Sequence, residues 1–482
     1  MDKFRKFDRD RQKIAFLGWL VGISSLILFC FSTLRFTWFR AGTDLVFFDQ
    51  LVFLLSQGQA PISSILEGVH LIGDHGAIIF YPLSLLYVIY PSVLWLLAIQ
   101  AIAFAVGSVP IYALSRDSGL GISYSRAIAL CYVLYPAIFN INFYTEFRPE
   151  AIAIPAVLWA ILAAKKRSPG QFAIAILLVL SCKETMSLTV FALGVWLALF
   201  QKRWLYGLGC IMSGLGWFIW AAVYLIPTFR AGRQMAGTWH YESLGSSMSE
   251  IGWTILSQPQ ILLSRSIQGD RLFYYLLLIL PILLGLHWRK LTAIVPALPM
   301  LLLNILADYP RQRDLIHHYS LPIIPFLFVW LIASLVYIKK RRLRSWLSPR
   351  WLIIWAVLAF LALGKYGYFW TRYAVVIPNL DAVRGAVNLV EPSDRVLTTA
   401  FIASALGHRP TIKLIQGEWD LKRIETNSLD TILIGLQHLG WDTSVENANQ
   451  TIDILNNSSK FDLVYHQQNV FLYKKASSQK LP

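Results

Sequence analysis

The sequence has few charged residues and very few cysteines. Only 15% of its 482 residues are Asp, Glu, Lys or Arg, whereas 56% are hydrophobic. A soluble chain carries charge on roughly a quarter of its residues, so this composition argues against a soluble globular protein. The cysteines lie in or beside apolar segments without metal-ligand spacing, so neither a disulfide framework nor a zinc site is expected. They are Cys30, Cys131, Cys182 and Cys210.

The charges that are present follow a pattern along the chain. Clusters of Lys and Arg fill alternate gaps between long apolar runs, while Asp, Glu and His collect in the other gaps. Because a charge at mid-bilayer costs roughly 2.5–3.5 kcal/mol, apolar runs of about 20 residues predict membrane spans, and basic gaps predict the cytoplasmic side. The net charge of +16 is then explained by topology, and no nucleic-acid partner is expected.

This pattern predicts an α-helical polytopic membrane protein with about eleven transmembrane helices. The first apolar run lacks a small-residue cleavage site and is interpreted as a retained span that follows a cytoplasmic N-terminus. The predicted spans are 14–34, 93–114, 127–144, 151–164, two short helices within 172–200 joined at the outer side, 205–226, 272–286, 291–307, 320–338 and 351–370.

Two domains are expected. Residues 1–370 form the transmembrane domain, and residues 371–482 are polar enough for a small extracytoplasmic α/β domain. That domain contains no phosphate-binding glycine loop, so its expected role is structural or acceptor recognition.

The first outer gap begins with an apolar segment that is too short to span. Residues 45–55 predict an amphipathic helix lying along the membrane surface, and a second surface helix is expected over 78–90. Asp44 occupies an N-cap position before the first helix, which is compatible with a capping role, a catalytic role or both. Asp49 follows about one turn later.

Other polar residues lie at the outer ends of predicted spans. Glu146, Arg148 and Glu150 occupy one short turn, and Lys183 with Glu184 interrupts an apolar stretch. Charges inside an apolar stretch indicate an internal salt bridge or a polar cavity, and for Lys183 the cavity is favoured.

A further polar group follows the ninth span. Arginine, histidine and tyrosine at a membrane surface suit a lipid-linked phosphate, although single Arg and Tyr residues there also serve as interfacial anchors. This group contains Arg311, Arg313, His317, His318 and Tyr319.

Six stretches form an ordered series of motifs along the chain, namely TDLVFFDQLVFLLSQG, GDHGAIIFYPLSLLYVIYPS, FRPEAIAIP, SCKETMSLTVFALG, LIHHYSLPIIP and a tail that begins IPNLDAVRGAVNLVEPSDRVLTTAFIASALGHRP. In these motifs the chain resembles a bacterial membrane family known as domain of unknown function 2079. The sequence departs from the family pattern at Arg148, where the family usually has His, so a metal-ligand role for that turn is doubtful. The family in turn resembles the GT-C glycosyltransferases.

This resemblance implies a membrane glycosyltransferase of the bacterial inner membrane. Its donor would be a sugar on a polyprenyl phosphate, and its acceptor would be extracytoplasmic. Asp44 would be the catalytic base, and Asp49 would assist or face water. Arg311, Arg313 and Lys183 would neutralise the phosphate, while Glu146 and Glu150 would position the acceptor or a divalent ion such as Mg²⁺ or Mn²⁺. The full set of candidate substrate-binding residues is Asp74, His75, Glu146, Arg148, Glu150, Lys183, Glu184, Arg311, Arg313, His317, His318 and Tyr319.

Two other functions remain open at this stage. A transporter or flippase would also contain intramembrane charges, although no internal repeat is evident and the polar residues gather on one face. A structural scaffold of the cell envelope is the third alternative. For the enzyme, the long outer segment 228–271, with Arg230, Arg233, His240 and Tyr241, is expected to close over the site.

Overall fold

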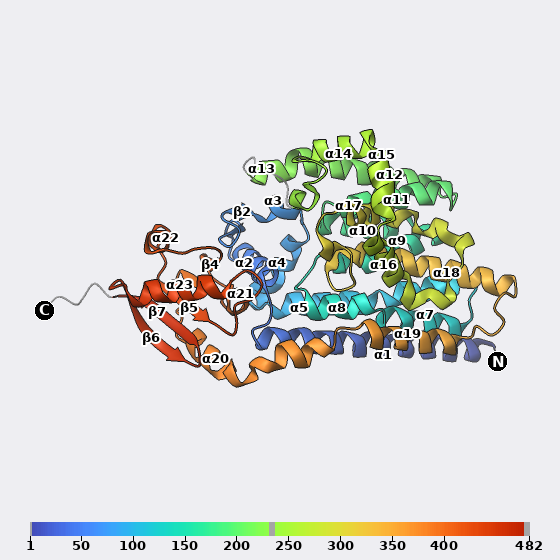
Figure 1. Cartoon of the computed structure of the whole chain (residues 1–482). Coiled ribbons are helices and arrows are strands. Elements are labelled where there is room, and N and C mark those ends of the chain that lie inside the picture. Colours follow the sequence, from blue (N-terminus) through green and yellow to red (C-terminus); the bar gives the residue numbers. More distant parts are fainter. Residues whose placement is uncertain (1, 231–236, 477–482) are drawn as a thin grey trace. The chain divides into compact units, whose positions relative to one another are not determined.

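The computed structural model describes residues 2–230 and 237–476, with side chains from residue 13 onward, and is shown in Figure 1. Its contacts divide the chain into two compact units. Unit 1 contains Met1–Phe29, Ile72–Ile79 and Ala98–Lys365, and unit 2 contains Cys30–Leu71, Phe80–Leu97 and Tyr366–Pro482. These units differ from the contiguous domains 1–370 and 371–482 predicted above, because most of the first outer loop packs within unit 2.

Unit 1 is built almost entirely from helices, many of which run alongside one another in Figure 1. Three described α-helices contain residues of both units, namely α1 (Asp2–Thr37), α3 (Leu71–His75), of which only Leu71 belongs to unit 2, and α5 (Leu94–Val106). The other α-helices assigned to unit 1 are α6 (Ser108–Asp117), α7 (Ile122–Val133), α8 (Pro136–Tyr144), α9 (Glu150–Lys166), α10 (Pro169–Cys182), α11 (Met186–Leu199), α12 (Trp204–Trp220), α13 (Ile226–Arg230), α14 (Met248–Ser257), α15 (Pro259–Ser266), α16 (Gly269–Ile279), α17 (Leu298–Leu306), α18 (Ile324–Lys340) and α19 (Pro349–Leu363).

Among the described residues, six helical segments are long and apolar enough to cross a membrane, and a bent pair would make a seventh. Several other apolar helices, such as α10 and α11, are shorter than a full span. The count of eleven spans therefore stays a prediction. The predicted break between two short helices is present, since α10 ends at Cys182 and α11 begins at Met186.

Small residues allow α11 and α12 to pack closely. A Cβ atom at Gly194 would lie 2.6 Å from the carbonyl oxygen of Gly207, and a Cβ at Gly207 would lie 2.7 Å from the Cβ of Ala198. Backbones that approach this closely are typical of helix pairs in membranes, where dispersion contacts replace the hydrophobic effect. Larger side chains at either glycine would force the two helices apart.

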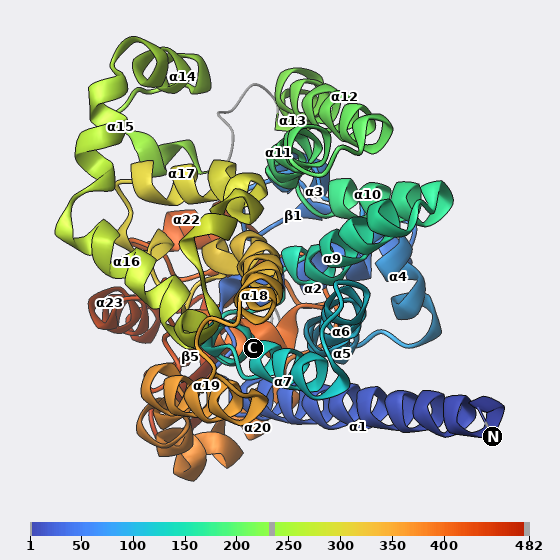
Figure 2. The same cartoon turned by 90° about the vertical axis from the view of Figure 1, so that its right-hand side faces the viewer.

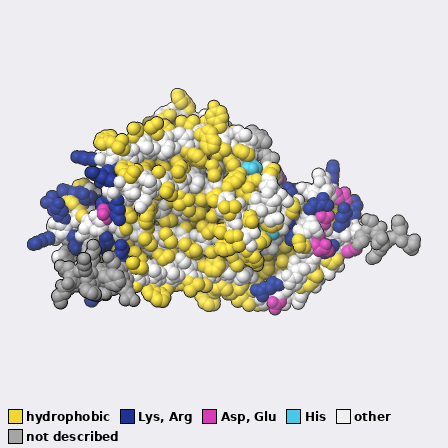
Figure 3. Space-filling model, turned by 180° about the vertical axis from the view of Figure 1, so that it is seen from behind, with side chains coloured by type: hydrophobic (Ala, Val, Ile, Leu, Met, Phe, Trp, Pro, Cys, Tyr) yellow, Lys and Arg dark blue, Asp and Glu magenta, His cyan; other side chains and the backbone are white. Residues whose placement is uncertain are grey.

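The surface of unit 1 is apolar, as a membrane protein requires. Trp19, Ile174 and Leu205 are 71%, 70% and 86% exposed. Figure 3 shows hydrophobic side chains covering the helical part of the chain, with Lys and Arg gathered at one end of it. Exposed apolar area on this scale is found where lipid replaces water.

Unit 2 contains a five-stranded sheet in the order β4-β3-β5-β7-β6. Strand β3 is parallel to β4 and β5, whereas β7 is antiparallel to β5 and β6. The strands are β3 (Val396–Thr398), β4 (Ile412–Leu414), β5 (Thr431–Gly435), β6 (Phe461–Gln467) and β7 (Val470–Lys475). The helices that follow Tyr373 are α20 (Leu380–Asn388), α21 (Ala400–Ala403), α22 (Leu421–Thr426) and α23 (Val445–Asn456).

Both faces of this sheet carry an apolar core. Leu433 of β5 packs in one core with residues of α20 and α21, and its neighbour Ile432 packs in another with residues of α22 and α23. Successive strand residues point to opposite faces, so the strand must be apolar throughout. This explains the uninterrupted apolar run TILIG.

Unit 2 also contains most of the first outer loop, and here one prediction is wrong. The helix α2 (Thr43–Ser56) was expected to be amphipathic and to lie on the membrane surface, but nine of its residues are buried, from Leu45 through Val52 and at Leu54. A helix that is apolar on all sides is buried in protein. It packs against α4 (Phe80–Ile89), the strand β1 (Ile62–Ser63) and α21. The strand β2 (Val69–His70) pairs with β1.

Asp49 joins α2 to the rest of unit 2. It is 2% exposed, so the alternative in which it faces water is wrong. Its Oδ1 atom accepts a hydrogen bond from the Tyr87 hydroxyl at 2.7 Å and lies 3.0 Å from Nε2 of His408. Burial opposes protonation of His408, but the hydrogen bond to Asp49 and its charge raise the pKa of His408 on balance.

The ion pair of Asp49 and His408 predicts a pH-dependent stability. Because the pKa of His408 is raised above its unfolded value of about 6.5, the pair stabilises the fold fully below that pH and loses this contribution as pH rises through the folded pKa. We expect Asp49→Asn to lower the free energy of unfolding by about 1–3 kcal/mol near pH 6 and by less near pH 9. Thermal and denaturant unfolding at both pH values measures this difference.

The matched control is Asp381→Asn, since the Asp381 side chain is 98% exposed and its ion pair is with the half-exposed Arg384 on the same helix. This variant should unfold like the wild type at both pH values. An Asp49→Asn effect that is absent, or equally large at both pH values, would contradict the role of the pair.

Candidate functional site

Ionisable side chains from several segments of unit 1 gather where α3 meets the break between α10 and α11. The two segments are joined by backbone hydrogen bonds, from Glu184 N to His75 O at 3.2 Å and from Ile79 N to Ser181 O at 2.9 Å. Figure 2 shows α3 beside α10 and α11. We call this group the polar cluster, and its members are Asp74, His75, Arg148, Glu150, Lys183, Glu184, Arg230, His240 and His318.

A buried ion pair lies at the centre of the polar cluster. The Lys183 ammonium donates to Oε1 of Glu150 at 2.9 Å, and the two side chains are 12% and 5% exposed. Lys183 has extended backbone (φ −164°), which ends α10, and Glu150 is the first residue of α9. Of the two alternatives left open for Lys183, the internal salt bridge is present. The polar cavity, which was the favoured alternative, stays a prediction.

His75 lies between two carboxylates. Its Nε2 is 3.4 Å from Asp74, and its Nδ1 is 3.8 Å from Glu184. Burial opposes protonation, but the charges of Asp74 and Glu184 outweigh it and raise the pKa of His75. The imidazole is thus biased toward the cationic form, which is the form that an anionic ligand would favour.

A close contact between α3 and α13 brings an arginine to the polar cluster. A Cβ atom on Gly73 would lie 2.5 Å from the carbonyl oxygen of Phe229, so only glycine allows this approach. The Arg230 guanidinium donates to the Gly73 carbonyl at 3.2 Å and lies 3.8 Å from Asp74. Arg230 belongs to the segment predicted to close over the site, whereas Arg233 of that segment lies outside the described residues.

Two histidines complete the polar cluster. His240 is 8% exposed, its Nδ1 lies 2.9 Å from the Gln312 amide, and its ring stacks on Tyr309. Burial, together with the nearby charges of Lys183 and His75, lowers the pKa of His240 to about 4, which keeps this ring neutral. His318 is buried and lies near enough to Arg148, Lys183 and His75 to feel their charges.

The turn that contains Glu146 and Arg148 is fixed by a residue that sequence reasoning missed. Gln100 of α5 accepts a hydrogen bond from the Arg148 backbone N–H at 2.8 Å, and its amide nitrogen is 3.5 Å from the carbonyl oxygen of Glu146. Glu146 and Arg148 are each 9% exposed. The only available signal was a single polar residue within the apolar helix LWLLAIQAIAFAV.

The residues after α17 are more dispersed than predicted. Arg313 donates to Asp270 at 3.0 Å. It also donates to the carbonyl oxygens of Asn304 and Ala307 at 3.1 and 2.7 Å, which gives hydrogen-bond partners to carbonyl groups at the C-terminal end of α17. Arg311 is exposed and lies over the Tyr309 ring. The predicted phosphate role of both arginines stays a prediction.

The next two predicted residues have mainly local contacts. His317 pairs with Asp314 at 2.6 Å, and its ring lies edge-on to Tyr144. The Tyr319 carbonyl accepts a hydrogen bond from Asn304 at 3.0 Å, and the Tyr319 ring lies edge-on to His240. His317 lies near enough to His318 of the polar cluster for its charge to act on that ring.

The two aspartates predicted to be catalytic belong to unit 2. Asp44 is partly buried and is the second residue of α2, whose N-cap is Gly42. The N-cap interpretation of Asp44 is therefore wrong, although a carboxylate in the first turn still suits the helix dipole. Asp49 is held by Tyr87 and His408, as described above, and this environment favours a structural role.

Several buried polar atoms of the polar cluster have no hydrogen-bond partner within the described parts of the chain. They are Oε2 of Glu184, Nδ1 of His75, Nε of Arg230 and Nε2 of His240. Buried polar groups are nearly always hydrogen-bonded, so these atoms require water or a polar ligand. Among the described residues, no group of three or more His, Cys, Asp and Glu could hold a metal ion.

Comparison with solved structures identifies the fold. The chain aligns with ArnT from Cupriavidus metallidurans at 10% identity, over 96% of this chain and 99% of that one, with a TM-score of 0.51 for the form bound to undecaprenyl phosphate. The apo form of ArnT aligns at 10% identity, over 95% and 97% of the two chains, with a TM-score of 0.52. An oligosaccharyltransferase, AglB from Archaeoglobus fulgidus, aligns at 11% identity over 95% of this chain and 75% of that chain, with a TM-score of 0.41.

No curated protein matches the chain by sequence. Residues 36–472 match a family described as "Predicted membrane protein (DUF2079)". The predicted resemblance is thus confirmed for the family, and the neighbours confirm it for the GT-C-like fold. The chain belongs to the DUF2079 family of membrane proteins.

Proposed function

We propose that the protein transfers a sugar from a polyprenyl-phosphate donor to an acceptor outside the cytoplasm. The observation that carries this proposal is the polar cluster, where buried ionisable groups with unsatisfied polar atoms meet at one end of apolar helices. The shared fold with ArnT, which has been solved with undecaprenyl phosphate, supports a lipid-linked phosphate as the ligand.

The chemistry of the polar cluster suits such a donor. Cationic His75, Lys183 and Arg230 would stabilise the charge that develops on the leaving phosphate. Oε2 of Glu184, which has no hydrogen-bond partner among the described residues, would accept a hydrogen bond from a sugar hydroxyl. Because the phosphate leaves as an anion that needs no proton, the site requires charge stabilisation and no general acid at the leaving group.

In the proposed reaction, Asp44 is the general base, an assignment that rests on the family resemblance. The acceptor hydroxyl gives its proton to Asp44, its oxygen forms a bond to the anomeric carbon, and the bond from that carbon to the phosphate oxygen breaks. The anomeric configuration is inverted, and the polyprenyl phosphate departs with the bonding electron pair. Arg311 and Arg313 remain proposed phosphate contacts.

The proposal also includes a divalent cation, Mg²⁺ or Mn²⁺, near Glu146 or Glu150. The described residues offer no protein-only set of three ligands, so the donor phosphate would have to supply oxygen ligands. When bound, such an ion would neutralise phosphate charge. No step above depends on it.

We further propose that the chain has eleven spans, that its N-terminus is cytoplasmic, and that the C-terminal segment 371–482 is extracytoplasmic. The polarity of α9 supports this orientation, because Glu150 of the polar cluster begins the helix and Lys165 and Lys166 end it. The competing function is a transporter or flippase, which buried charges between apolar helices would also suit.

The orientation can be checked with reporter fusions. A fusion after Lys340, at the basic end of α18, should report a cytoplasmic location, and a fusion after Lys475 should report an extracytoplasmic one. Alkaline phosphatase and green fluorescent protein give complementary signals. The same sidedness at both positions would contradict the proposed topology.

The role of Asp44 can be tested with an isosteric variant. We expect Asp44→Asn to fold normally, because an amide is tolerated in the first turn of α2, while transfer falls by roughly 10²-fold or more. Purified wild-type and variant protein would be compared in a transfer assay with a panel of polyprenyl-phosphate sugars, alongside thermal unfolding. Unchanged turnover in the folded variant would exclude Asp44 as the base. Donor binding without turnover in the wild type, together with substrate flux in liposomes, would favour the transporter.

The buried ion pair allows stability and binding to be separated. Lys183→Met leaves Glu150 buried without its cation and should cost about 3–5 kcal/mol of stability. The double variant Lys183→Met/Glu150→Gln removes both charges and should recover most of this stability while still binding the donor phosphate poorly. Denaturant unfolding and a donor-binding assay measure the two effects.

Lys474→Met is the control, because its partner Glu391 is 67% exposed. Normal donor binding by the double variant would remove Lys183 from the site.

A further inference from the structure

Unit 1 contains a second polar site, a cavity of about 390 Å³. Its walls come from the C-terminal ends of α6, α9 and α11, the short connection between α11 and α12, the 3₁₀ segment Trp288–Ala297 and the middle of α18. This cavity is distinct from the polar cluster. Along α9, Glu150 of the polar cluster and Lys165 of the cavity are separated by roughly 22 Å at about 1.5 Å per residue.

The cavity is lined by three cations and few opposing charges. Lys165 pairs with Asp117 at 3.0 Å and donates to the Ser118 hydroxyl at 2.9 Å. Arg203 donates to the Lys165 carbonyl oxygen at 3.1 Å, and Lys290 lies over the Tyr337 ring. Within the described residues, neither Arg203 nor Lys290 has a carboxylate at ion-pair distance, so the cavity has an excess of positive charge.

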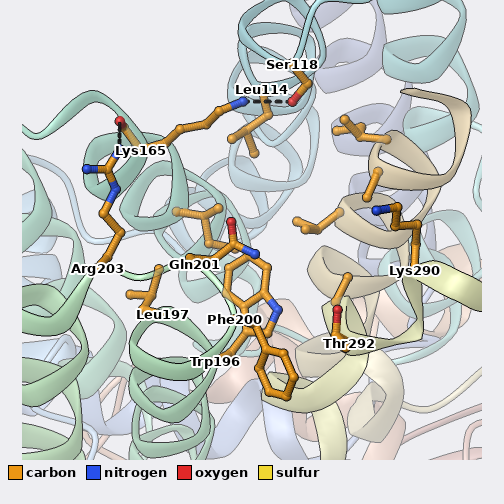
Figure 4. Close-up of a pocket in the computed structure, with 15 residues that line it drawn as sticks. Leu114, Ser118, Lys165, Trp196, Leu197, Phe200, Gln201, Arg203, Lys290 and Thr292 are labelled. Atoms are coloured by element: carbon orange, nitrogen blue, oxygen red, sulfur yellow. Dashed lines mark hydrogen bonds between the residues drawn. The ribbon is translucent and has the colours of Figure 1, made fainter. Parts of the chain in front are cut away.

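A buried hydrogen-bond donor also lines the cavity. Trp196 is 4% exposed, and its indole Nε1 has no hydrogen-bond partner among the described residues. Figure 4 shows Trp196 together with Gln201, Lys290 and Thr292 around one space. An indole N–H can only donate, so this buried atom requires an acceptor, such as an oxygen of a bound molecule.

We infer that this cavity binds the phosphate headgroup of an anionic phospholipid. Arg203 and Lys290 supply charge for the phosphate, and the Trp196 N–H donates to one of its oxygens. Basic cavities between transmembrane helices bind anionic lipid headgroups in this way. Leu197 and Phe200 form an apolar wall beside the cations, which suits the glycerol and first acyl carbons of a lipid better than free phosphate.

The test measures lipid binding to the full-length protein. Detergent-purified protein would be titrated with phosphatidylglycerol, phosphatidylcholine or inorganic phosphate, and bound lipid followed by native mass spectrometry and thermal unfolding. We expect phosphatidylglycerol alone to bind and to raise the unfolding temperature. Arg203→Gln/Lys290→Gln should weaken this binding roughly tenfold or more, and Trp196→Phe, which keeps the ring but removes the donor, should weaken it by a few fold.

Lys202→Gln serves as the matched control, because it removes one charge beside Arg203 from a side chain that does not line the cavity. It should bind phosphatidylglycerol like the wild type. Equal binding by the wild type and the double variant would overturn the inference, as would an equal loss of affinity in Lys202→Gln. Inorganic phosphate that stabilises the protein as strongly as phosphatidylglycerol would overturn the assignment to a lipid.

Discussion

The buried ion pair between Lys183 and Glu150 is the interaction on which the functional end of unit 1 depends. Each charge would be expensive alone among apolar helices, and the pair is tolerated because the ammonium donates directly to the carboxylate at 2.9 Å. The pair ties the break between α10 and α11 to the start of α9. The same break contacts α3, because the backbone N–H of Glu184 donates a hydrogen bond to the carbonyl oxygen of His75. Charges from separate segments are thereby held together in one place.

The sequence predicted this end of the molecule well, because charge inside an apolar run has few physical explanations. Lys183 and Glu184 could be selected on that ground alone, whereas Glu150 was selected from the short turn before α9. The structure brings all three together with His75. Gln100 could not be selected, since a lone amide in an apolar helix has many uses. Its role in holding the turn at Arg148 depends on tertiary packing that no local pattern encodes.

The errors have a common physical origin, which is that burial is a tertiary property. The apolar segment of α2 is too short to span a bilayer and was assigned to the membrane surface, but its partners in unit 2 cover it. Asp49 accordingly contacts Tyr87 and His408 instead of water. Arg313 donates hydrogen bonds to carbonyl groups at the C-terminal end of α17, a role that the pattern of arginines in the sequence did not indicate. The family resemblance supplied the fold, which periodicity alone could not.

The central claim is that the polar cluster of unit 1 receives the phosphate of a lipid-linked donor. The most direct measurement is an experimental structure with a polyprenyl-phosphate sugar analogue bound. We expect phosphate oxygens within hydrogen-bond distance of Lys183, His75 or Arg230, and a sugar hydroxyl near Glu184. A phosphate bound elsewhere in the protein, with the polar cluster filled only by water, would contradict it.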